Sequence, residues 1–244
     1  MNKNFIFLTE TESTNNYANQ LLLTKAAMEG TVVMTQFQTK GKGQQGNSWE
    51  SEPGKNLLVS YILQPKFLKA ANQFYLSKAV SLALTDLLTE ENIEVSIKWP
   101  NDIYTGNKKI AGILIENTIM GQNLYTSVAG IGLNLNQTVF ISDAPNPVSL
   151  TQLTGKNYNV EIVAERLWEN LKFRYNELRS GDLKEIEVTY LSRLFRYQTW
   201  AFYAKQGVVF EARITGIGQF GQLRLEHRSG EISEHLFKEV EFVI

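Results

Sequence analysis

The residues best suited to chemistry lie in four short segments of the first 136 positions, and a glycine-rich loop is the first of them. In residues 41–47, three glycines are interspersed with Lys42, Gln44, Gln45 and Asn47. Glycines at this spacing let successive backbone amides turn toward one ligand, and the lysine adds positive charge. The pattern fits a carboxylate or a phosphate. It matches neither the P-loop nor the dinucleotide fingerprint, so a flexible connection between two strands stays an alternative.

The second segment is Lys-Trp-Pro-Asn-Asp at 98–102. Its proline ends a predicted strand, and Asn101 and Asp102 follow at the strand end. Their oxygens could hold Mg²⁺ or the ribose and phosphates of a nucleotide. Pro-Asn-Asp is also ordinary turn chemistry. A lysine and a tryptophan directly before these residues favour the wall of a ligand site.

The third segment, 108–116, is an apolar strand that begins with two lysines. Lys109 stands at the edge of this strand, where water is scarce and an ammonium group binds an anion strongly. A hairpin lysine that reaches solvent is the alternative. Gly112 lies inside the strand and indicates close approach by a ligand or by another backbone.

The fourth segment, 129–136, is a second apolar strand with two glycines followed by asparagines. Gly130 again indicates a backbone that lies against a ligand, and Asn134 is a polar side chain able to contact it. A β-bulge is the structural alternative.

The composition excludes several kinds of chemistry. The 244 residues contain no cysteine, which removes disulfides, thiolate metal sites and cysteine nucleophiles. The two histidines, His227 and His235, lie near the C-terminus, so the preceding residues cannot form a Ser-His-Asp triad or a histidine-ligated zinc site. Lys, Asp, Asn, Gln and backbone amides remain, and these groups suit carboxylate and phosphate chemistry.

The charge and hydropathy patterns bear on partners and location. Lys and Arg number 24 and Asp and Glu number 25, a net charge of −1 that gives no support for nucleic-acid binding. No apolar run approaches the ~20 residues of a membrane span, and the N-terminus does not read as a signal peptide. We therefore expect a cytoplasmic protein without a membrane partner.

Hydrophobic periodicity predicts an α+β fold followed by a small β unit. The predicted strands are 4–9, 31–37, 57–63, 94–99, 109–117 and 124–136. The predicted helices lie within 11–23, 70–91, 163–178 and 186–194. A long loop is expected over 39–56, and a further loop over 142–147. Past about residue 197, five or so short strands predict an SH3-like β-barrel, which divides the chain into domains 1–196 and 197–244.

Taken together and in order, six blocks resemble the biotin–protein ligase family over nearly the whole chain. The blocks are 13–15 (Ser-Thr-Asn), Gln38 with the glycine-rich loop, Trp49, 98–102, 108–116 and 130–136. The resemblance implies an α+β catalytic domain like that of class II aminoacyl-tRNA synthetases, with a mixed or antiparallel sheet, plus a C-terminal SH3-like β-barrel. It also implies a reaction in two steps. Biotin and Mg-ATP form biotinyl-5′-adenylate, and a lysine of a biotin carboxyl carrier protein then attacks it.

The resemblance implies a role for each matching residue. Catalytic roles fall to Lys109, Asp102 and Lys42, with Asp102 also the ligand of Mg²⁺. Biotin would be bound by Ser13, Thr14, Asn15, Gln38, Gly41, Lys42, Gln44, Trp49, Lys109, Gly112 and Gly130. The nucleotide would be bound by Gly43, Asn47, Trp49, Asn101, Asp102, Lys109 and Asn134.

Two departures from the family pattern stand out. The family's loop is typically arginine-rich, whereas here Lys42, Gln44, Gln45 and Asn47 take the basic positions. The family also often stacks a tryptophan on adenine, but residues 144–150 contain none. The chain starts directly at the catalytic block, so we expect the monofunctional type without a DNA-binding domain. A homodimer is left open.

Two other functions remain as alternatives. A lipoate or octanoate ligase would share the fold and the acyl-adenylate chemistry, but this chain lacks the Arg-Arg-x-x-Gly-Gly-Gly pattern of that group. A catalytically silent module that binds biotin or its adenylate is conceivable because the loop is altered. The retained Lys109, Asp102 and Asn134 argue against it, since a module that binds only biotin needs no residues for a nucleotide.

Overall fold

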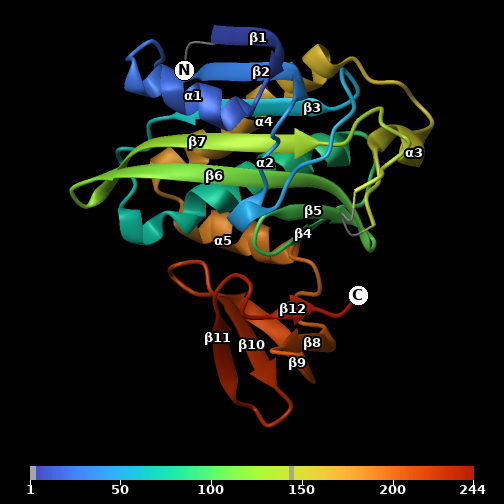
Figure 1. Ribbon diagram of the computed structural model, residues 1–244. Helices are drawn as coiled ribbons and strands as arrows, with labels where there is room; N and C mark the ends of the chain where they lie inside the picture. Colours follow the sequence, from blue (N-terminus) through green and yellow to red (C-terminus); the bar gives the residue numbers. More distant parts are fainter. Residues whose placement is uncertain (1–3, 143–145) are drawn as a thin grey trace.

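Two β-sheets, described by a computed structural model over residues 4–142 and 146–244, organise the chain (Figure 1). The seven-stranded sheet has the order β1-β2-β3-β7-β6-β5-β4. Its strands are β1 Asn4–Thr11, β2 Thr31–Gln38, β3 Leu57–Leu63, β4 Ser96–Lys98, β5 Asp102–Thr105, β6 Lys108–Met120 and β7 Asn123–Leu133. β1 pairs with β2 in parallel and the remaining ladders are antiparallel, so the predicted mixed sheet is confirmed.

Helices cover both faces of this sheet. Helix α1 (Thr14–Leu23) lies on one face, and α2 (Phe74–Glu90), α4 (Val160–Ser180) and α5 (Leu183–Ser192) lie on the other (Figure 1). Strand β3 is apolar in six of its seven residues and buried along its whole length because both faces are covered. Ile62 packs toward α1, whereas Tyr61 stacks on Trp168 of α4 with ring centroids 5.7 Å apart.

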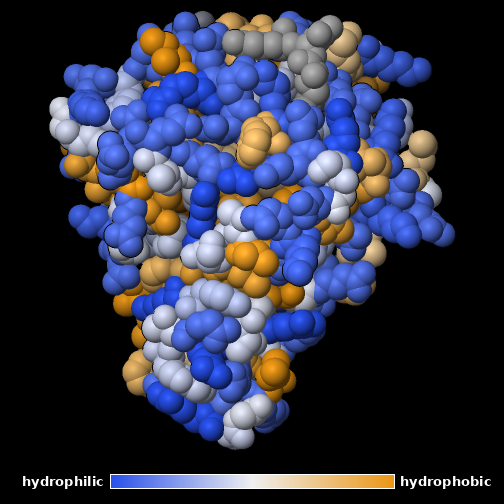
Figure 2. All heavy atoms as spheres, turned by 180° about the vertical axis from the view of Figure 1, so that it is seen from behind, coloured by the Kyte–Doolittle hydropathy of each residue, from blue (hydrophilic) through white to orange (hydrophobic). Residues whose placement is uncertain are grey.

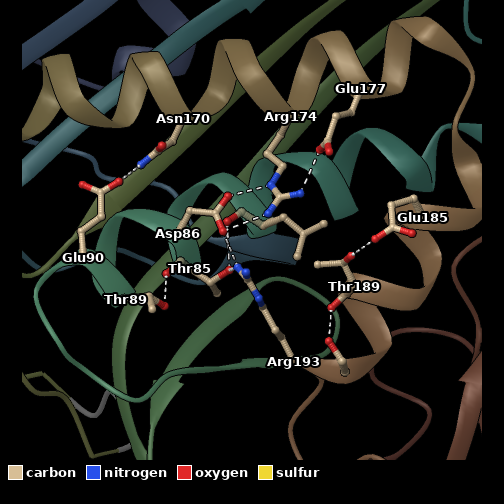
Figure 3. A network of polar contacts seen from close by, with 12 residues as sticks. Thr85, Asp86, Thr89, Glu90, Asn170, Arg174, Glu177, Glu185, Thr189 and Arg193 are labelled. Carbon is tan, nitrogen blue, oxygen red and sulfur yellow. Dashed lines mark hydrogen bonds and ion pairs between the residues drawn. The ribbon is translucent and has the colours of Figure 1, made fainter.

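An ion-pair network joins the three helices behind the sheet (Figure 3). Asp86 of α2 lies between Arg174 of α4 and Arg193 at the end of α5, with N···O distances of 2.6 Å to each. Burial opposes ionisation of this carboxyl group, but the two guanidinium groups outweigh that effect and lower the pKa of Asp86. The outer surface of this helical layer is mostly hydrophilic (Figure 2).

The C-terminal residues form a five-stranded antiparallel sheet of order β11-β10-β9-β8-β12. Its strands are β8 Trp200–Lys205, β9 Val208–Ile217, β10 Leu223–His227, β11 Ile232–His235 and β12 Glu241–Phe242. A turn of this sheet packs on the larger unit at Gly221, whose φ is +92°. Its carbonyl accepts a hydrogen bond from Trp99 Nε1 at 2.8 Å, and a Cβ here would lie 2.5 Å from the ring of Phe74.

The observed elements differ from the predicted ones mainly at their ends. The strand predicted over 94–99 is confined to β4, and the strand predicted over 124–136 ends at Leu133. A short helix that the sequence reading missed, α3 (Leu150–Thr154), begins with a capping box between Ser149 and Gln152. Residues 143–145 of the predicted 142–147 loop lie outside the described residues. None of the described helices is long and apolar enough to cross a membrane.

Candidate functional site

A cavity of about 140 Å³ opens where the glycine-rich loop covers β6 and β7. It gathers residues from six separate parts of the sequence, including the start of α1, the 98–102 turn and Phe237 near the C-terminus. The predicted site residues that line it are Ser13, Thr14, Asn15, Gln38, Lys42, Gly43, Gln44, Asn47, Trp49, Asn101, Asp102, Lys109, Gly112 and Gly130. Gly41 and Asn134 do not line this cavity; Asn134 lines an adjoining one, described below.

The floor of the cavity is a network of uncharged polar side chains that the Glu116 carboxylate supports from β6. Gln38 Oε1 accepts hydrogen bonds from the backbone N–H (2.8 Å) and the hydroxyl (3.1 Å) of Thr14. Ser60 Oγ lies 2.7 Å from Thr14 Oγ1 and 2.6 Å from Asn15 Oδ1. Asn15 Nδ2 donates to Glu116 Oε2 at 2.9 Å. These bonds fix the side chains in place, so the floor offers preorganised neutral dipoles to a ligand.

Sequence reasoning missed Ser60 and Glu116. Ser60 is fully buried in the otherwise apolar run of β3, and Glu116 supports Asn15 from β6. A polar residue inside a strand that is apolar on both sides is the signal that could have identified Ser60. The strand ladder places it opposite Gly130, directly beneath Asn15.

Trp49 lies across the two glycine-containing strands. A Cβ at Gly112 would be 3.0 Å from its Cζ3 atom, and a Cβ at Gly132 would be 2.4 Å from its Cε2 atom. At Gly130, a Cβ would be only 2.2 Å from Asn15 Oδ1. The close approach predicted at the strand glycines is therefore made by an indole ring and a carboxamide of the chain itself.

The glycine-rich loop forms a closed turn beside the indole. Gly43 N–H donates to the Asn47 carbonyl at 2.7 Å, and Trp49 N–H donates to the Gly41 carbonyl at 2.9 Å. Lys42 is exposed, and its Nζ atom donates to Asn16 Oδ1 at 2.6 Å. The single cation of the loop is thus held near α1 by a neutral partner, which leaves its charge available to an anion.

Two buried polar atoms in the cavity wall have no hydrogen-bond partner among the residues that the structure describes. They are Gln44 Oε1, an acceptor, and Trp49 Nε1, a donor. Buried polar atoms without a partner are rare in folded proteins. Both residues line the first cavity, so a small shift of either side chain would let a bound ligand with a donor and an acceptor satisfy these atoms.

Lys109 and Asp102 form an ion pair at the end of the cavity, with Nζ 2.7 Å from Oδ1. Side chains alternate along a strand, so Lys109 and Gly112 would face opposite sides of a regular β6. A bulge opposite Ile103 and Tyr104 inserts one extra residue, and it turns Lys109 to the side of Gly112 and Asp102. The indole of Trp49 lies 5.6 Å from the lysine Nζ atom.

The two predicted asparagines make backbone contacts in this arrangement. Asn101 Nδ2 donates to the Ile113 carbonyl at 2.6 Å, which fastens the 98–102 turn to β6. Asn134 is buried, and its Nδ2 donates to the Val148 carbonyl at 3.1 Å. The geometry gives both asparagines a positioning role. Contact with a ligand by either residue stays a prediction.

A smaller cavity of about 50 Å³ adjoins the first one. Trp49 and Lys109 line both cavities. Ser48 also lines both, and the wall of the smaller cavity is completed by Glu50, Asn134, Phe140 and Pro147. Lys109 therefore stands where the two spaces meet, within reach of groups bound in either one.

Lys98 is a third cation of the site, beside Lys42 and Lys109. It lines the first cavity and is enclosed by the rings of Tyr104 and Phe242, with Nζ 4.9 Å and 5.1 Å from their centroids. Burial lowers the pKa of Lys98, and the nearby Asp102 carboxylate partly opposes that shift. Sequence reasoning treated this lysine only as part of a wall. Phe237 of the C-terminal unit, which it did not single out, also lines the cavity.

The donor set around Asp102 bears on metal binding. Across residues 4–142 and 146–244, no group of three or more His, Cys, Asp or Glu side chains is placed to hold a metal ion. If Asp102 binds a metal ion, as predicted, it would do so without a cluster of further protein ligands among the described residues. Such a site fits Mg²⁺, which commonly binds one or two carboxylates together with substrate phosphates and water. It does not fit a resident metal held by protein ligands alone.

The fold thus holds a site of two cavities that meet at Lys109. The model of the biotin/lipoate A/B protein ligase family matches residues 7–134, and the chain belongs to this family. The family resemblance noted in the sequence is therefore confirmed.

Individual relatives agree with this assignment. The bifunctional ligase/repressor BirA of Bacillus spizizenii is 28% identical over 236 residues, which cover 94% of this chain and 71% of BirA. The biotin–[acetyl-CoA-carboxylase] ligase of Mycobacterium tuberculosis is 28% identical over 179 residues, 72% of this chain and 65% of that ligase. The biotin protein ligase of Aquifex aeolicus, solved in complex with biotin and ATP, superposes with a TM-score of 0.82 at 25% identity. This match covers 99% of this chain and 100% of that one.

Proposed function

We propose that this protein is a biotin–protein ligase. Biotin's carboxylate oxygen attacks the α-phosphorus of ATP, pyrophosphate leaves, and biotinyl-5′-adenylate forms. An amine of a carrier lysine then attacks the anhydride carbonyl, forming an amide and releasing AMP. The observation that carries the proposal is the position of Lys109 where two adjoining cavities meet, paired with Asp102 at 2.7 Å.

The first cavity suits the acid. Its floor of Ser, Thr, Asn and Gln dipoles matches a neutral ring that carries both hydrogen-bond donors and an acceptor, as the ureido group of biotin does. The unpaired Gln44 Oε1 and Trp49 Nε1 add one acceptor and one donor. Lys42 and Lys109 would attract the carboxylate at the other end of the acid.

The second cavity, with Trp49, Asn134 and Phe140 in its wall, would take the nucleotide. Two anions must meet for adenylation, so the reaction needs fixed positive charge between them. Lys109 would supply that charge to the biotin carboxylate and the α-phosphate. Asp102 positions its ammonium group and would bind Mg²⁺, which supplies charge neutralisation to the leaving pyrophosphate. No protein nucleophile is required.

The experiment that tests this function measures pyrophosphate release from Mg-ATP with biotin, with lipoate and with no acid. Release that depends on biotin is expected. Release that depends on lipoate instead would favour the lipoate ligase, which is the less supported alternative. Biotin binding without any release would favour the catalytically silent module.

Partners and location extend the proposal. The acceptor would be a biotin carboxyl carrier protein, because the second step needs an exposed lysine on a carrier domain. We further infer that the protein acts in the cytoplasm without binding DNA, which the net charge of −1 supports. A homodimer and the division at residue 197 into two domains remain part of this proposal.

A further inference from the structure

Glu50 joins the glycine-rich loop to the segment that walls the second cavity. Its Oε1 atom accepts hydrogen bonds from Ile141 N–H at 2.9 Å and from Gln137 Nε2 at 3.2 Å. Its Oε2 atom accepts a hydrogen bond from Ser142 N–H at 2.9 Å. One carboxylate therefore gathers two successive backbone amides of residues 137–142, a geometry that suits a negative charge.

Gln137 makes the second connection between the same two segments. Its Oε1 atom accepts from Glu52 N–H at 2.9 Å and from Asn56 Nδ2 at 2.6 Å. Its Nε2 atom donates to Glu50 and also to the Val139 carbonyl at 2.8 Å. The carboxamide is buried, and its oxygen and nitrogen both have hydrogen-bond partners. Gln137 thus holds the start of residues 137–142, and Glu50 binds the backbone at their end.

The ionised state of Glu50 fits this role. Partial burial opposes ionisation, but hydrogen bonds from Ser142, Ile141 and Gln137 outweigh it and lower the pKa of Glu50. The residue directly before it, Trp49, forms part of both cavities. Glu50 therefore links the residue that places the indole directly to the backbone of residues 141 and 142.

We propose that Glu50 is a positioning residue that couples the occupancy of the two cavities. A ligand that holds the glycine-rich loop closed over the first cavity also fixes Glu50, and Glu50 then holds the backbone of residues 137–142 beside the second cavity. The inference rests on the proposed function, with biotin in the first cavity and the nucleotide in the second. Biotin binding would therefore preorganise the nucleotide side.

Coupling of this kind has a measurable form. If biotin increases the affinity for nucleotide by a certain factor, nucleotide increases the affinity for biotin by the same factor. Glu50→Gln removes the charge and one acceptor oxygen, and it points an NH₂ group at a backbone N–H. The variant should lose the coupling factor while the floor of the first cavity, which Glu50 does not touch, still binds biotin.

Calorimetry on the full chain tests the proposal with biotin and α,β-methylene-ATP, a nucleotide that cannot release pyrophosphate. In the unaltered protein, saturating biotin should tighten binding of the analogue by about 5-fold or more. In Glu50→Gln, the factor should fall below about 2-fold, and the Kd of biotin alone should change by less than about 2-fold. Glu50→Asp keeps the charge on a shorter side chain and should restore part of the factor.

Glu52→Gln is the matched control, because Glu52 is exposed, lies in the same loop and contacts Gln137 only through its backbone. Glu52→Gln should keep the coupling factor of the unaltered protein. If Glu50→Gln only loosened the loop, biotin and the nucleotide analogue would each bind more weakly, but the coupling factor would stay the same. That result would overturn the proposal. So would a factor near one in the unaltered protein. Because these are binding measurements, they stay informative even if biotin-dependent pyrophosphate release, the test of the function itself, is not observed.

Discussion

Lys109 Nζ and Asp102 Oδ1 lie 2.7 Å apart, and each side chain is about one-fifth exposed. The lysine comes from the start of β6 and the aspartate from the start of β5, and the bulge between these strands brings the two to one face of the sheet. In the proposed reaction, the pair holds an ammonium group between two substrates that repel each other.

Replacing Lys109 with alanine should lower biotin-dependent pyrophosphate release by about 10²-fold or more, because the fixed charge between carboxylate and α-phosphate is lost. The melting temperature should change little, since the side chain contributes little to the core. Lys108→Ala is the matched control, because Lys108 is exposed and adjacent. Normal turnover by Lys109→Ala would show that the central assignment is wrong.

Gly112→Val should weaken biotin binding by about 10-fold or more, because the side chain would enter the space now held by Trp49, 3.0 Å away. Calorimetry with biotin alone measures the effect. Gly216→Ala is the control, because a Cβ there would meet only Arg224 Cδ at 4.0 Å. Unaltered biotin affinity in Gly112→Val would refute the assignment of the first cavity.

Ser60→Ala should lower the free energy of unfolding by about 1–2 kcal/mol, because the buried Asn15 Oδ1 loses the hydroxyl 2.6 Å away. The KM for biotin should rise while the KM for ATP stays the same. Ser192→Ala removes an exposed hydroxyl and should change neither quantity. An equal rise in both KM values would instead indicate general damage to the fold.

Restoring guanidinium groups to the glycine-rich loop should lengthen retention of the adenylate. Gln44→Arg with Asn47→Arg adds two forked donors where the loop now carries only Lys42, and arginine pairs bidentately with phosphate. A filter-binding assay of labelled biotinyl-adenylate should show slower release than from the unaltered protein. Gln122→Arg, in the exposed β6–β7 turn, should have no effect. Release from the unaltered protein as slow as from an arginine-rich relative would contradict the prediction.

Asp86→Asn should lower the free energy of unfolding at pH 7 by about 3 kcal/mol, because Arg174 and Arg193 keep their charge without a partner. The folded state lowers the pKa of Asp86, so its stabilising contribution is present above the ordinary value of about 3.9 and is lost as the pH falls below it. Urea titrations across this range should therefore show that the difference in free energy of unfolding between Asp86→Asn and the unaltered protein becomes smaller in acid. Glu169→Gln, at an exposed pair with Lys172, should have little effect at any pH. A difference that stays constant with pH would exclude this explanation.

The large elements were predictable because burial fixes their patterns. Strand β3 and helix α2 match the apolar run at 57–63 and the helical stripe within 70–91 closely. Helix α3 escaped detection because five residues are too short for a periodic pattern, and only the capping pair of Ser149 and Gln152 signals it. Strand ends were misjudged by a few residues because pairing partners, and not propensity, decide where a ladder stops.

The membership of the site was predictable from motifs, but its internal geometry was not. Fourteen of the sixteen predicted residues line the first cavity, since the six blocks mark them directly. The direction of Lys109 depends on a bulge opposite Tyr104, which no local pattern reveals. The support of Asn15 by Ser60 and Glu116 joins three distant segments, and a single sequence contains no record of such contacts.

Phe237 places part of the cavity wall on the small C-terminal sheet, and Gly221 fastens a turn of that sheet to Trp99. Exchanging C-terminal segments between relatives would therefore also exchange a piece of the binding surface. A chimera that keeps residues 1–196 but receives a foreign C-terminal sheet would need a compatible ring and a compatible glycine at these two positions. Where the two units touch, a sequence change in one of them therefore requires a matching change in the other.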